Sequence, residues 1–298
     1  MEKLAVFLSA LVVFTCLLRT AGAEEVSVGL YLLNLGKFDV STGSYTADFY
    51  LHLKCQTACS SDFEFVNGRA ASLDKIEDGS NDKFYRIQAN LNSEVDLRRF
   101  PFDSQKIEMI LEDKKNTIEK LVYHPLLEES GIDKSIAFTG WEIKGWKAEA
   151  GEHYYPVYNE TYSQYKFSID ISRIAVNSFI KTFLPVIFIL MVVLFSFLLD
   201  PDKLTTRIGM AGSSLVAAVM FHVSITNQIP AVGYLTFADK FMVLSYLVLL
   251  SSFVVNIAML QLQELKKTDL VQKIHKKTEY SVFIIVPILF AVLFWFFL

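Results

Sequence analysis

The sequence predicts two parts of different structural class, an all-β extracellular immunoglobulin-like sandwich followed by an all-α bundle of four transmembrane helices. The first observation is a change of composition near residue 174, from mixed and polar to four long apolar stretches. The second is a series of roughly eight to ten short β-rich segments before that point, without a convincing amphipathic helix. We therefore predict a β-sandwich domain at 24–174 and a transmembrane domain at 175–298.

The first 23 residues have the composition of a secretory signal peptide. Lys3 supplies a positive charge, an apolar run follows it, and the small residues at 21–23 form a cleavage site. Cleavage would place residue 24 and the domain after it outside the cytoplasm. A retained signal anchor is the alternative interpretation.

Two cysteines remain after the predicted cleavage site, Cys55 and Cys59. Their spacing near a tight turn allows a small disulfide in an oxidising compartment. Free buried thiols are the alternative. Neither cysteine lies among residues that would make a metal site, and we expect no metal and no cofactor.

Strand-like segments follow one another through the first part. Residues 26–35 and 45–54 are β-rich and are separated by turn residues, which predicts a hairpin. An Asn-Gly turn ends the segment 63–68, and residues 73–82 are polar enough to be a loop. Further alternating segments are expected at 84–97, which resembles a strand pair, and at 106–113, 138–150 and 162–173.

Four apolar stretches in the second part are long enough to cross a bilayer as helices. Two of them contain prolines, Pro185 and Pro287, which membrane helices tolerate where neighbouring helices satisfy the freed backbone groups. The four stretches are 176–199, 205–228, 236–260 and 280–298.

The orientation of the chain follows from its lysines. The segment 261–279 is rich in lysine, whereas 229–235 has no Lys or Arg, so we expect 261–279 to be a cytoplasmic linker or a helical extension of the third stretch. The chain is then a multi-pass protein of the cell membrane, with its N-terminal domain and its C-terminus outside the cytoplasm. The lysines are Lys266, Lys267, Lys273, Lys276 and Lys277.

The second apolar stretch carries a stripe of residues at helical spacing. The stripe is small and polar at its inner end, apolar in the middle and polar again at its outer end. A helix facing lipid gains nothing from such a stripe, but a helix lining a water-filled path does. A helix that packs in a bundle through small residues is the alternative. The stripe consists of Gly209, Ser213, Val216, Met220, Val223, Ser224 and Asn227.

A short motif connects the two parts. Residues 96–103 read DLRRFPFD and are followed by Ser-Gln. A β-sandwich, this motif and four closely spaced membrane helices together resemble the pentameric ligand-gated ion channel (Cys-loop receptor) superfamily. The resemblance extends from about Val26 to the end of the chain. Further matches are TGWEI at 139–143, ISR at 171–173, FLP at 183–185 and Pro230 at the end of the second apolar stretch.

The chain departs from the animal members of that superfamily in several places. Ser93 and Ile107 stand where two cysteines bracket the motif in animal receptors, and the long cytoplasmic domain is missing. In both features the chain resembles the prokaryotic-type members, which lack the Cys-loop disulfide. The β-domain is also short and lacks several aromatic segments that normally contribute to the ligand pocket. The identity of the ligand therefore does not carry over.

The resemblance implies a homopentamer around a central pore that is lined by the second stretch. Arg207 matches the basic residue at the cytoplasmic mouth and is expected to face the lumen together with the stripe. Ser hydroxyls could replace part of an ion's water shell, and rings of Val and Met could dewet and close the path. Packing of Val216 and Met220 inside the bundle is the alternative.

Ion selectivity depends on the residues at the cytoplasmic mouth. Cation-selective relatives often have Glu just before the basic residue, whereas this chain has Thr205 and Thr206. The nearest acids are Asp200 and Asp202. A ring of Asp202 would favour cations, but helix capping is the other role for these acids. We expect a pore permeable to cations; the alternative is a pentameric receptor that is anion-selective or conducts poorly.

A coupling cluster is expected where the two parts meet. Asp103 in the motif and Arg173 at the end of the last strand would form a charge-assisted pair, with Asp39 from the first hairpin as a third member. A static surface salt bridge of little consequence is the alternative. By resemblance, the loop residues Phe100, Pro101, Phe102 and Asp103 transmit motion to Pro230 and Tyr234.

An aromatic segment at 145–163 is the candidate ligand site. Aromatic faces attract an ammonium group, and by resemblance this segment covers the agonist site. Packing on the sandwich edge is the alternative, and protons are a rival agonist because His52, His124 and His153 titrate near neutral pH. The candidate residues are Trp146, His153, Tyr154, Tyr155, Tyr158 and Tyr162.

His222 is an ionisable residue in the middle of the second stretch, and on the helical wheel it points away from the stripe. We expect a neutral histidine bonded to a neighbouring helix rather than a proton sensor. Enzymatic activity is not expected, because the sequence has no nucleophile elbow, metal-ligand cluster or phosphate loop. A formal charge of −4 is too weak to imply a nucleic-acid partner. The expected partners are other copies of this chain, membrane lipid, permeant ions, and a small-molecule agonist or protons.

Overall fold

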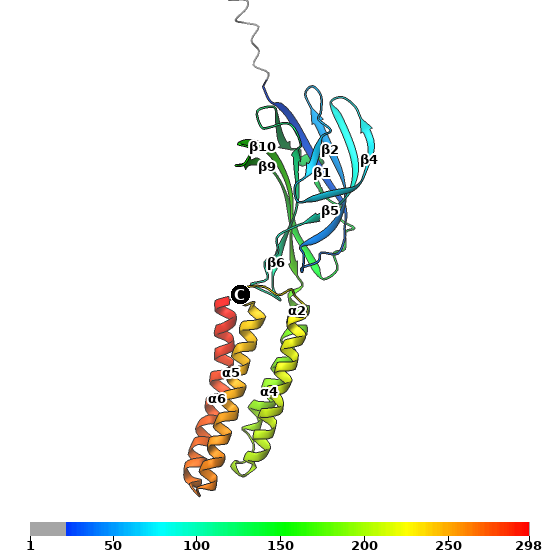
Figure 1. Ribbon diagram of the computed structural model, residues 1–298. Coiled ribbons are helices and arrows are strands. Elements are labelled where there is room, and N and C mark those ends of the chain that lie inside the picture. Colours follow the sequence, from blue (N-terminus) through cyan, green and yellow to red (C-terminus); the bar gives the residue numbers. More distant parts are fainter. Residues whose placement is uncertain (1–21, 298) are drawn as a thin grey trace, which may run out of the picture.

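The computed structural model describes residues 22–297, which form a β-domain followed by a set of long helices (Figure 1). The last strand ends at Arg173 and the first helix begins at Ala175. The predicted signal peptide at 1–23 falls, except for its last two residues, outside the described part of the chain.

Ten strands form two sheets that pack face to face, as an all-β sandwich requires. The first sheet has the order β4-β5-β2-β1-β7, with β8 paired to β1, and the second has the order β3-β6-β10-β9. The first sheet contains β1 (Glu24–Leu35), β2 (Ser44–Cys55), β4 (Gly68–Asp78), β5 (Asp82–Asn92), β7 (Leu121–Pro125) and β8 (Gly131–Ile132). The second contains β3 (Phe63–Phe65), β6 (Ser104–Asp113), β9 (Trp141–Tyr155) and β10 (Glu160–Arg173).

Alternating side chains of the central strands fill the space between the sheets. Val28 and Leu30 of β1 face Phe167 and Ile169 of β10 across the same core, and all four are almost fully buried. The period of two in the sequence thus places one face of each strand inside. Cys55 and Cys59 form a disulfide just after β2, with their Cα atoms 5.3 Å apart.

Two sequence expectations for this domain were wrong. The polar segment 73–82 is not a loop: most of it belongs to β4, whose residues are nearly all exposed because this edge strand pairs only with β5. Residues 84–97 do not form a strand pair but lie mostly in the single strand β5. Hydrophobic alternation does not reveal an edge strand that is covered on neither face.

The helical part has three helices long and apolar enough to cross a membrane, or four if a bent pair counts as one span. The bent pair joins α2 (Ala175–Thr182) and α3 (Leu184–Ser196) at 44°. Pro185 explains the break, because it has no N–H to donate to the carbonyl of Lys181. The three long helices are α4 (Leu204–Thr226), preceded by the 3₁₀ turn η2 (Pro201–Lys203), α5 (Phe237–Glu264) and α6 (Thr268–Phe297).

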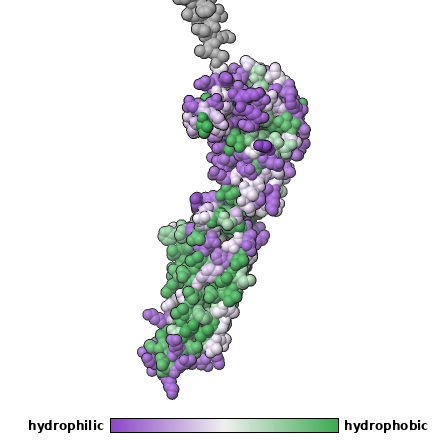
Figure 2. Space-filling model, viewed as in Figure 1, coloured by the Kyte–Doolittle hydropathy of each residue, from purple (hydrophilic) through white to green (hydrophobic). Residues whose placement is uncertain are grey.

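The predicted linker at 261–279 is corrected by the structure. Only its first four residues extend the third stretch, because α5 ends at Glu264, and most of the rest belongs to α6, which begins at Thr268. Val271 in this early part of α6 is buried and packs into the core of the bundle, which holds the segment in a helix. Hydrophobic surface covers the helical part and hydrophilic surface most of the β-domain (Figure 2), as expected for a multi-pass membrane protein.

Candidate functional site

One face of α4 is left uncovered in the subunit. Val216 is 64% exposed and Met220 67%, and the other members of the stripe are exposed as well. The opposite face of α4 is buried against α3 and α5. Apolar side chains and small polar residues therefore share an uncovered surface in the middle of a membrane helix. The remaining stripe members are Gly209, Ser213, Val223, Ser224 and Asn227.

Arg207 does not belong to this face, so its predicted lumen-facing position was wrong. It is fully buried in the subunit. Arg207 precedes Gly209 by two residues, which places it roughly 200° away around the helix. Its guanidinium lies 4.6 Å from the ring centroid of Phe197, and its Nη1 is 3.3 Å from Nδ1 of His275. This arginine joins α3, α4 and α6 inside the bundle.

The residues predicted to set selectivity lie at the same end of α4 as Arg207 but are exposed. Thr205, Thr206 and Asp202 are all on the surface of the subunit. Asp202 has only a loose contact with Lys203, at 3.5 Å. Asp200 is the N-cap of η2 but makes no side-chain capping bond. The N-cap of α4 is Lys203, which makes none either. Helix capping therefore does not account for Asp200 or Asp202.

Arg173 and Asp103 form a close pair where β10 meets the helices. Nε of Arg173 donates to Oδ1 of Asp103 at 2.6 Å, and Asp103 is 1% exposed. Gln105 donates to the second oxygen of Asp103 at 2.7 Å. The guanidinium also lies over the rings of Trp141 and Phe100, at 4.5 and 5.1 Å. The pair is therefore half-enclosed by aromatic rings and is not a surface salt bridge.

Asp39 is not a third member of this cluster, contrary to the prediction. Its carboxylate accepts hydrogen bonds from the backbone N–H of Ser41 at 2.8 Å and from the hydroxyl of Thr42 at 3.3 Å. The bond from Ser41 holds the pKa of Asp39 below its usual value. A short acidic side chain in a tight turn bonds to its own backbone, which removes it from longer-range contacts.

The loop that carries Phe100 and Phe102 caps α5. The backbone N–H groups of Phe237 and Ala238 donate to the carbonyls of Arg98 and Phe100, at 2.9 and 3.0 Å. These donors open α5 and have no partner within the helix. The β-domain thus supplies acceptors that the membrane helix needs.

Side chains strengthen the same junction. The hydroxyl of Tyr234 accepts a hydrogen bond from the backbone N–H of Leu97 at 2.9 Å, and the ring of Phe102 stacks on Phe183 at 5.7 Å. Pro101 is buried in this loop, and Pro230 is half-buried after α4. The loop is therefore in direct contact with the segment between α4 and α5 and with the start of α5.

The six predicted ligand residues do not form one site. Trp146 stacks on Phe167 at 5.3 Å and packs against the core. Tyr154 bonds to Asn159 in the β9–β10 hairpin, and Tyr158 is exposed at its tip. Trp146 and Tyr154 are eight residues apart along β9, and Tyr158 lies beyond the end of that strand, so distance along the hairpin separates them.

The remaining three predicted ligand residues lie around Glu112, a buried carboxylate that no sequence pattern indicated. Nδ1 of His153 and the hydroxyl of Tyr155 lie 2.7 and 3.0 Å from its oxygens, and the ring of Tyr162 lies against Tyr155. The side chain of Glu112 is 3% exposed. It fastens the turn end of the β9–β10 hairpin to the end of β6, a contact that only the strand pairing reveals.

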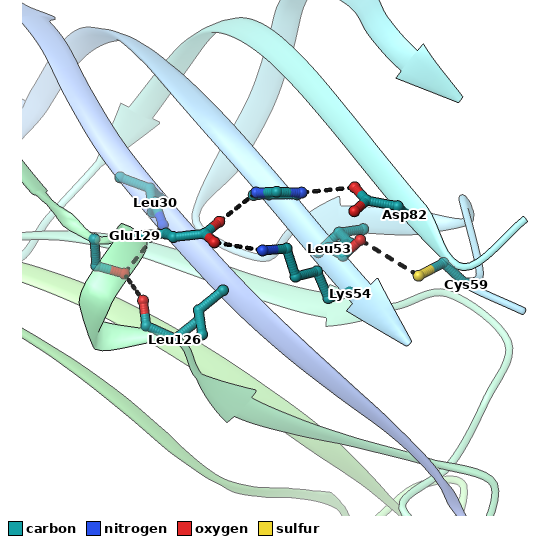
Figure 3. A network of polar contacts seen from close by, with 9 residues as sticks. Leu30, Leu53, Lys54, Cys59, Asp82, Leu126 and Glu129 are labelled. Atoms are coloured by element: carbon teal, nitrogen blue, oxygen red, sulfur yellow. Dashed lines mark hydrogen bonds and ion pairs between the residues drawn. The ribbon is translucent and has the colours of Figure 1, made fainter. Parts of the chain in front are cut away.

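A second polar network on the outer face of the first sheet was also missed. His52 bridges two carboxylates, Asp82 at 2.6 Å and Glu129, and Lys54 pairs with Glu129 as well (Figure 3). The hydrogen bond from Lys54 holds the pKa of Glu129 below its usual value. The short helix η1 (Leu127–Glu129) brings Glu129 over β1 and β2.

This network borders a cavity of about 390 Å³. Its lining combines aromatic rings with carboxylates, a pairing that suits an organic cation. Besides His52 and Glu129, the lining includes Tyr31, Tyr50, Phe84, Glu77 and Glu128. His124, the remaining histidine that we considered as a proton sensor, does not line this cavity.

His222 bonds to the neighbouring helix, as expected for an inward-facing histidine. Its Nδ1 lies 2.9 Å from the hydroxyl of Tyr246 and its Nε2 lies 3.2 Å from Asp239, both on α5. Asp239 also completes the capping box of α5 with Thr236. The contact therefore joins the outer part of α4 to the start of α5.

Comparison with known proteins gave related sequences but no matching family model. A proton-gated ion channel of Gloeobacter violaceus is 25% identical over 184 residues, which is 61% of this chain and 51% of that protein. A serotonin-gated chloride channel of Caenorhabditis elegans is 25% identical over 158 residues, or 53% of this chain and 32% of that protein. An acetylcholine receptor subunit of Drosophila melanogaster is 27% identical over 186 residues, or 57% and 31%. The chain thus spans about half the length of the first relative and about a third of the other two.

Proposed function

We propose that this chain forms a homopentameric channel of the pentameric ligand-gated superfamily, because the proteins it resembles include a proton-gated ion channel and a serotonin-gated chloride channel. In this proposal α4 lines a central pore that opens when the β-sandwich receives a stimulus. The observation that carries it is the uncovered stripe of α4. A symmetric ring of α4 helices would cover the helix flanks and leave this stripe facing water.

The order of residues along the stripe supports a gated pore. Ser213 would offer a ring of hydroxyls to a passing ion, and Val216 and Met220 would form apolar rings that exclude water when the helices close together. Arg207 does not face the lumen in this arrangement. It would instead fix the angle of α4 against α3 and α6 at the cytoplasmic mouth.

We propose that the β-domain and the C-terminus lie outside the cytoplasm. The lysines at the turn between α5 and α6 support this orientation by the positive-inside rule, because the β-domain and the C-terminal end of α6 lie at the other end of the helices (Figure 1). The expected location is the cell membrane.

The stimulus is an organic amine or a proton. The cavity beside His52 supports an amine, because carboxylates and aromatic rings line it together. His52 and His153 support protons, since each contacts a carboxylate with which a charged imidazole would form an ion pair. The relatives include a serotonin-gated and a proton-gated channel, so both classes occur in the superfamily.

Ion flux through purified, reconstituted protein tests the proposal. The full chain is incorporated into liposomes, and flux is measured over a series of pH values and with a panel of amines. Flux that appears with one stimulus supports the channel. If an amine is the stimulus, Glu129→Gln should raise the concentration needed for half-maximal flux, because it removes a carboxylate from the cavity lining. Saturable binding of an amine without flux under any condition would instead identify a receptor that does not conduct.

Asp202→Asn is expected to lower the preference of the pore for cations over anions by about threefold or more, because a ring of charges at a pore mouth raises the local counter-ion concentration. The reversal potential in a KCl gradient measures this preference. Asp200→Asn is the matched control, since Asp200 precedes the turn η2 in extended backbone and lies outside the helical segment that carries Asp202. An unchanged potential in Asp202→Asn, or an anion-selective unmodified channel, would contradict the assignment.

A further inference from the structure

Arg207 and His275 form a buried polar contact at the end of the helices away from the β-domain (Figure 1). Nη1 of Arg207 lies 3.3 Å from Nδ1 of His275. The arginine is fully buried, and the side chain of His275 is only 12% exposed. Because Arg207 lies in the first turn of α4 and His275 near the start of α6, the contact joins the inner ends of two helices.

This contact fixes the protonation state of His275. The guanidinium of Arg207 has only N–H donors, so Nδ1 of His275 must accept the hydrogen bond. An imidazole that accepts at Nδ1 is neutral and carries its proton on Nε2. Nε2 lies 3.9 Å from the carboxylate of Glu279, which is beyond hydrogen-bond distance. The contact with Arg207 therefore requires a neutral histidine.

Arg207 depends on this single acceptor. Its Nε and Nη2 are buried and have no hydrogen-bond partner among the described residues. The ring of Phe197, 4.6 Å away, attracts the positive charge but supplies no oxygen or nitrogen acceptor. A proton on Nδ1 of His275 would remove the acceptor and place a second positive charge beside the guanidinium. The contact cannot persist with a charged ring.

The charged groups around His275 provide an alternative partner for the ring. Within the described chain, Arg207 and Lys276 oppose a positive charge on the ring, whereas Glu279 and Asp200 favour it. Glu279 lies one turn further along α6, on the side of Nε2. The neutral ring thus binds Arg207, and the charged ring is drawn toward Glu279. This is a two-state element that one proton can switch.

We propose that His275 is a proton sensor on the cytoplasmic side of this protein. While it is neutral, it holds Arg207 and so joins the inner end of α4 to α6. A proton from the cytoplasm turns the ring toward Glu279 and releases the inner end of α4. The side from which the proton comes rests on the proposed orientation, and any effect on ion flow rests on the proposed pore. The contact between the two helices depends on neither.

Thermal unfolding of the purified full-length protein measures the contact without any conduction. Below about pH 6.5 the unfolded chain binds a proton at His275 that the folded contact excludes, so stability falls as the pH falls. Unmodified protein should lose about 3 °C more in Tm between about pH 7.5 and 5.5 than His275→Gln loses. The reason is that the amide oxygen of glutamine can accept from Arg207 at either pH.

Two further variants separate this contact from the other histidines. Glu279→Gln removes the carboxylate that receives the charged ring, so the loss of Tm in acid should become larger. His124→Gln is the matched control, because His124 is exposed on β7 in the β-domain. Its loss of Tm in acid should equal that of unmodified protein. An unchanged loss in His275→Gln, or an equal reduction in His124→Gln, would overturn the proposal.

Solid-state NMR of protein labelled with ¹⁵N-histidine tests the protonation state directly. The signals that disappear in His275→Gln belong to His275. They should show a neutral ring with its proton on Nε2 at about pH 7.5, and a growing charged form as the pH falls. A ring that is already charged at that pH, or that carries its proton on Nδ1, would contradict the contact with Arg207.

Currents in excised membrane patches show on which side the proton acts. Acid on the cytoplasmic face should reduce the stimulus-evoked current of unmodified protein, because the inner end of α4 loses its anchor, and should have little effect in His275→Gln. Acid on the side of the β-domain tests the proposed proton stimulus instead. Equal losses in both proteins would overturn the sensor. A protein without current would refute the channel alone, and the melting and NMR results would then decide the sensor.

Discussion

Arg173→Ala is expected to abolish stimulus-evoked current while the protein still reaches the membrane as an oligomer. Arg173 connects β10 to the loop that caps α5, because its guanidinium pairs with Asp103 and lies over Phe100 and Trp141. Without it, Asp103 remains almost fully buried with its charge uncompensated. Removing one partner of a buried pair costs about 3–5 kcal/mol.

The expected size of the effect follows from that cost. A gating equilibrium that depends on this junction would shift by about a hundredfold or more, since 1.4 kcal/mol corresponds to a factor of ten. Current in response to the stimulus and the amount of cross-linked oligomer at the surface are measured in the same cells. Arg173→Lys should recover little, because an ammonium cannot reproduce the planar contacts with two rings.

Arg86→Ala is the matched control for this substitution. Arg86 also pairs with an aspartate, Asp48, at 2.8 Å, but it lies on the exposed outer face of the first sheet. An exposed pair contributes about 1 kcal/mol or less, so the current should change little. Near-normal currents in Arg173→Ala would refute the coupling role.

Val216→Ser is expected to produce a channel that leaks without a stimulus. Val216 lies in the middle of the uncovered stripe, where an apolar ring would keep water out of the closed pore. A hydroxyl at this position hydrates the ring, and the symmetry of the assembly repeats the change in every subunit. We expect resting flux to rise by about tenfold or more, an effect that corresponds to only about 1.4 kcal/mol.

The control for the leak is Val292→Ser on α6. Val292 is also exposed, at 45%, but it lies on the helix farthest along the chain from α4, and α6 packs mainly on α5. Resting flux in liposomes without stimulus should stay at the level of the unmodified protein. If Val292→Ser leaks as strongly, or Val216→Ser stays closed, α4 does not supply the gate.

The sequence was sufficient for the fold class because the two parts differ in periodicity. Alternation along β1 and β10 predicted the sandwich, and length and apolar character predicted the membrane helices. The sequence did not predict β4, because the polar residues of this strand give it no buried face. It also did not predict the start of α6, where the packing of Val271 extends the helix beyond its apolar stretch.

The candidate pore face could also be predicted from the sequence, with the exception of Arg207. Because Arg207 is a basic residue at the pore mouth, it was expected to face the lumen. Its position two residues before Gly209 places it on the other side of the helix. Helical spacing was the stronger signal and should have decided its orientation.

The amino-acid sequence by itself determined the order of the two parts, the membrane segments and the stripe of α4, because each depends on a repeat along the chain. Only the tertiary structure decided that Asp39 stays outside the predicted pair of Asp103 and Arg173, and that Glu112 contacts both His153 and Tyr155. These partners lie far apart in sequence. Their meeting depends on strand register and loop docking, which no local pattern encodes.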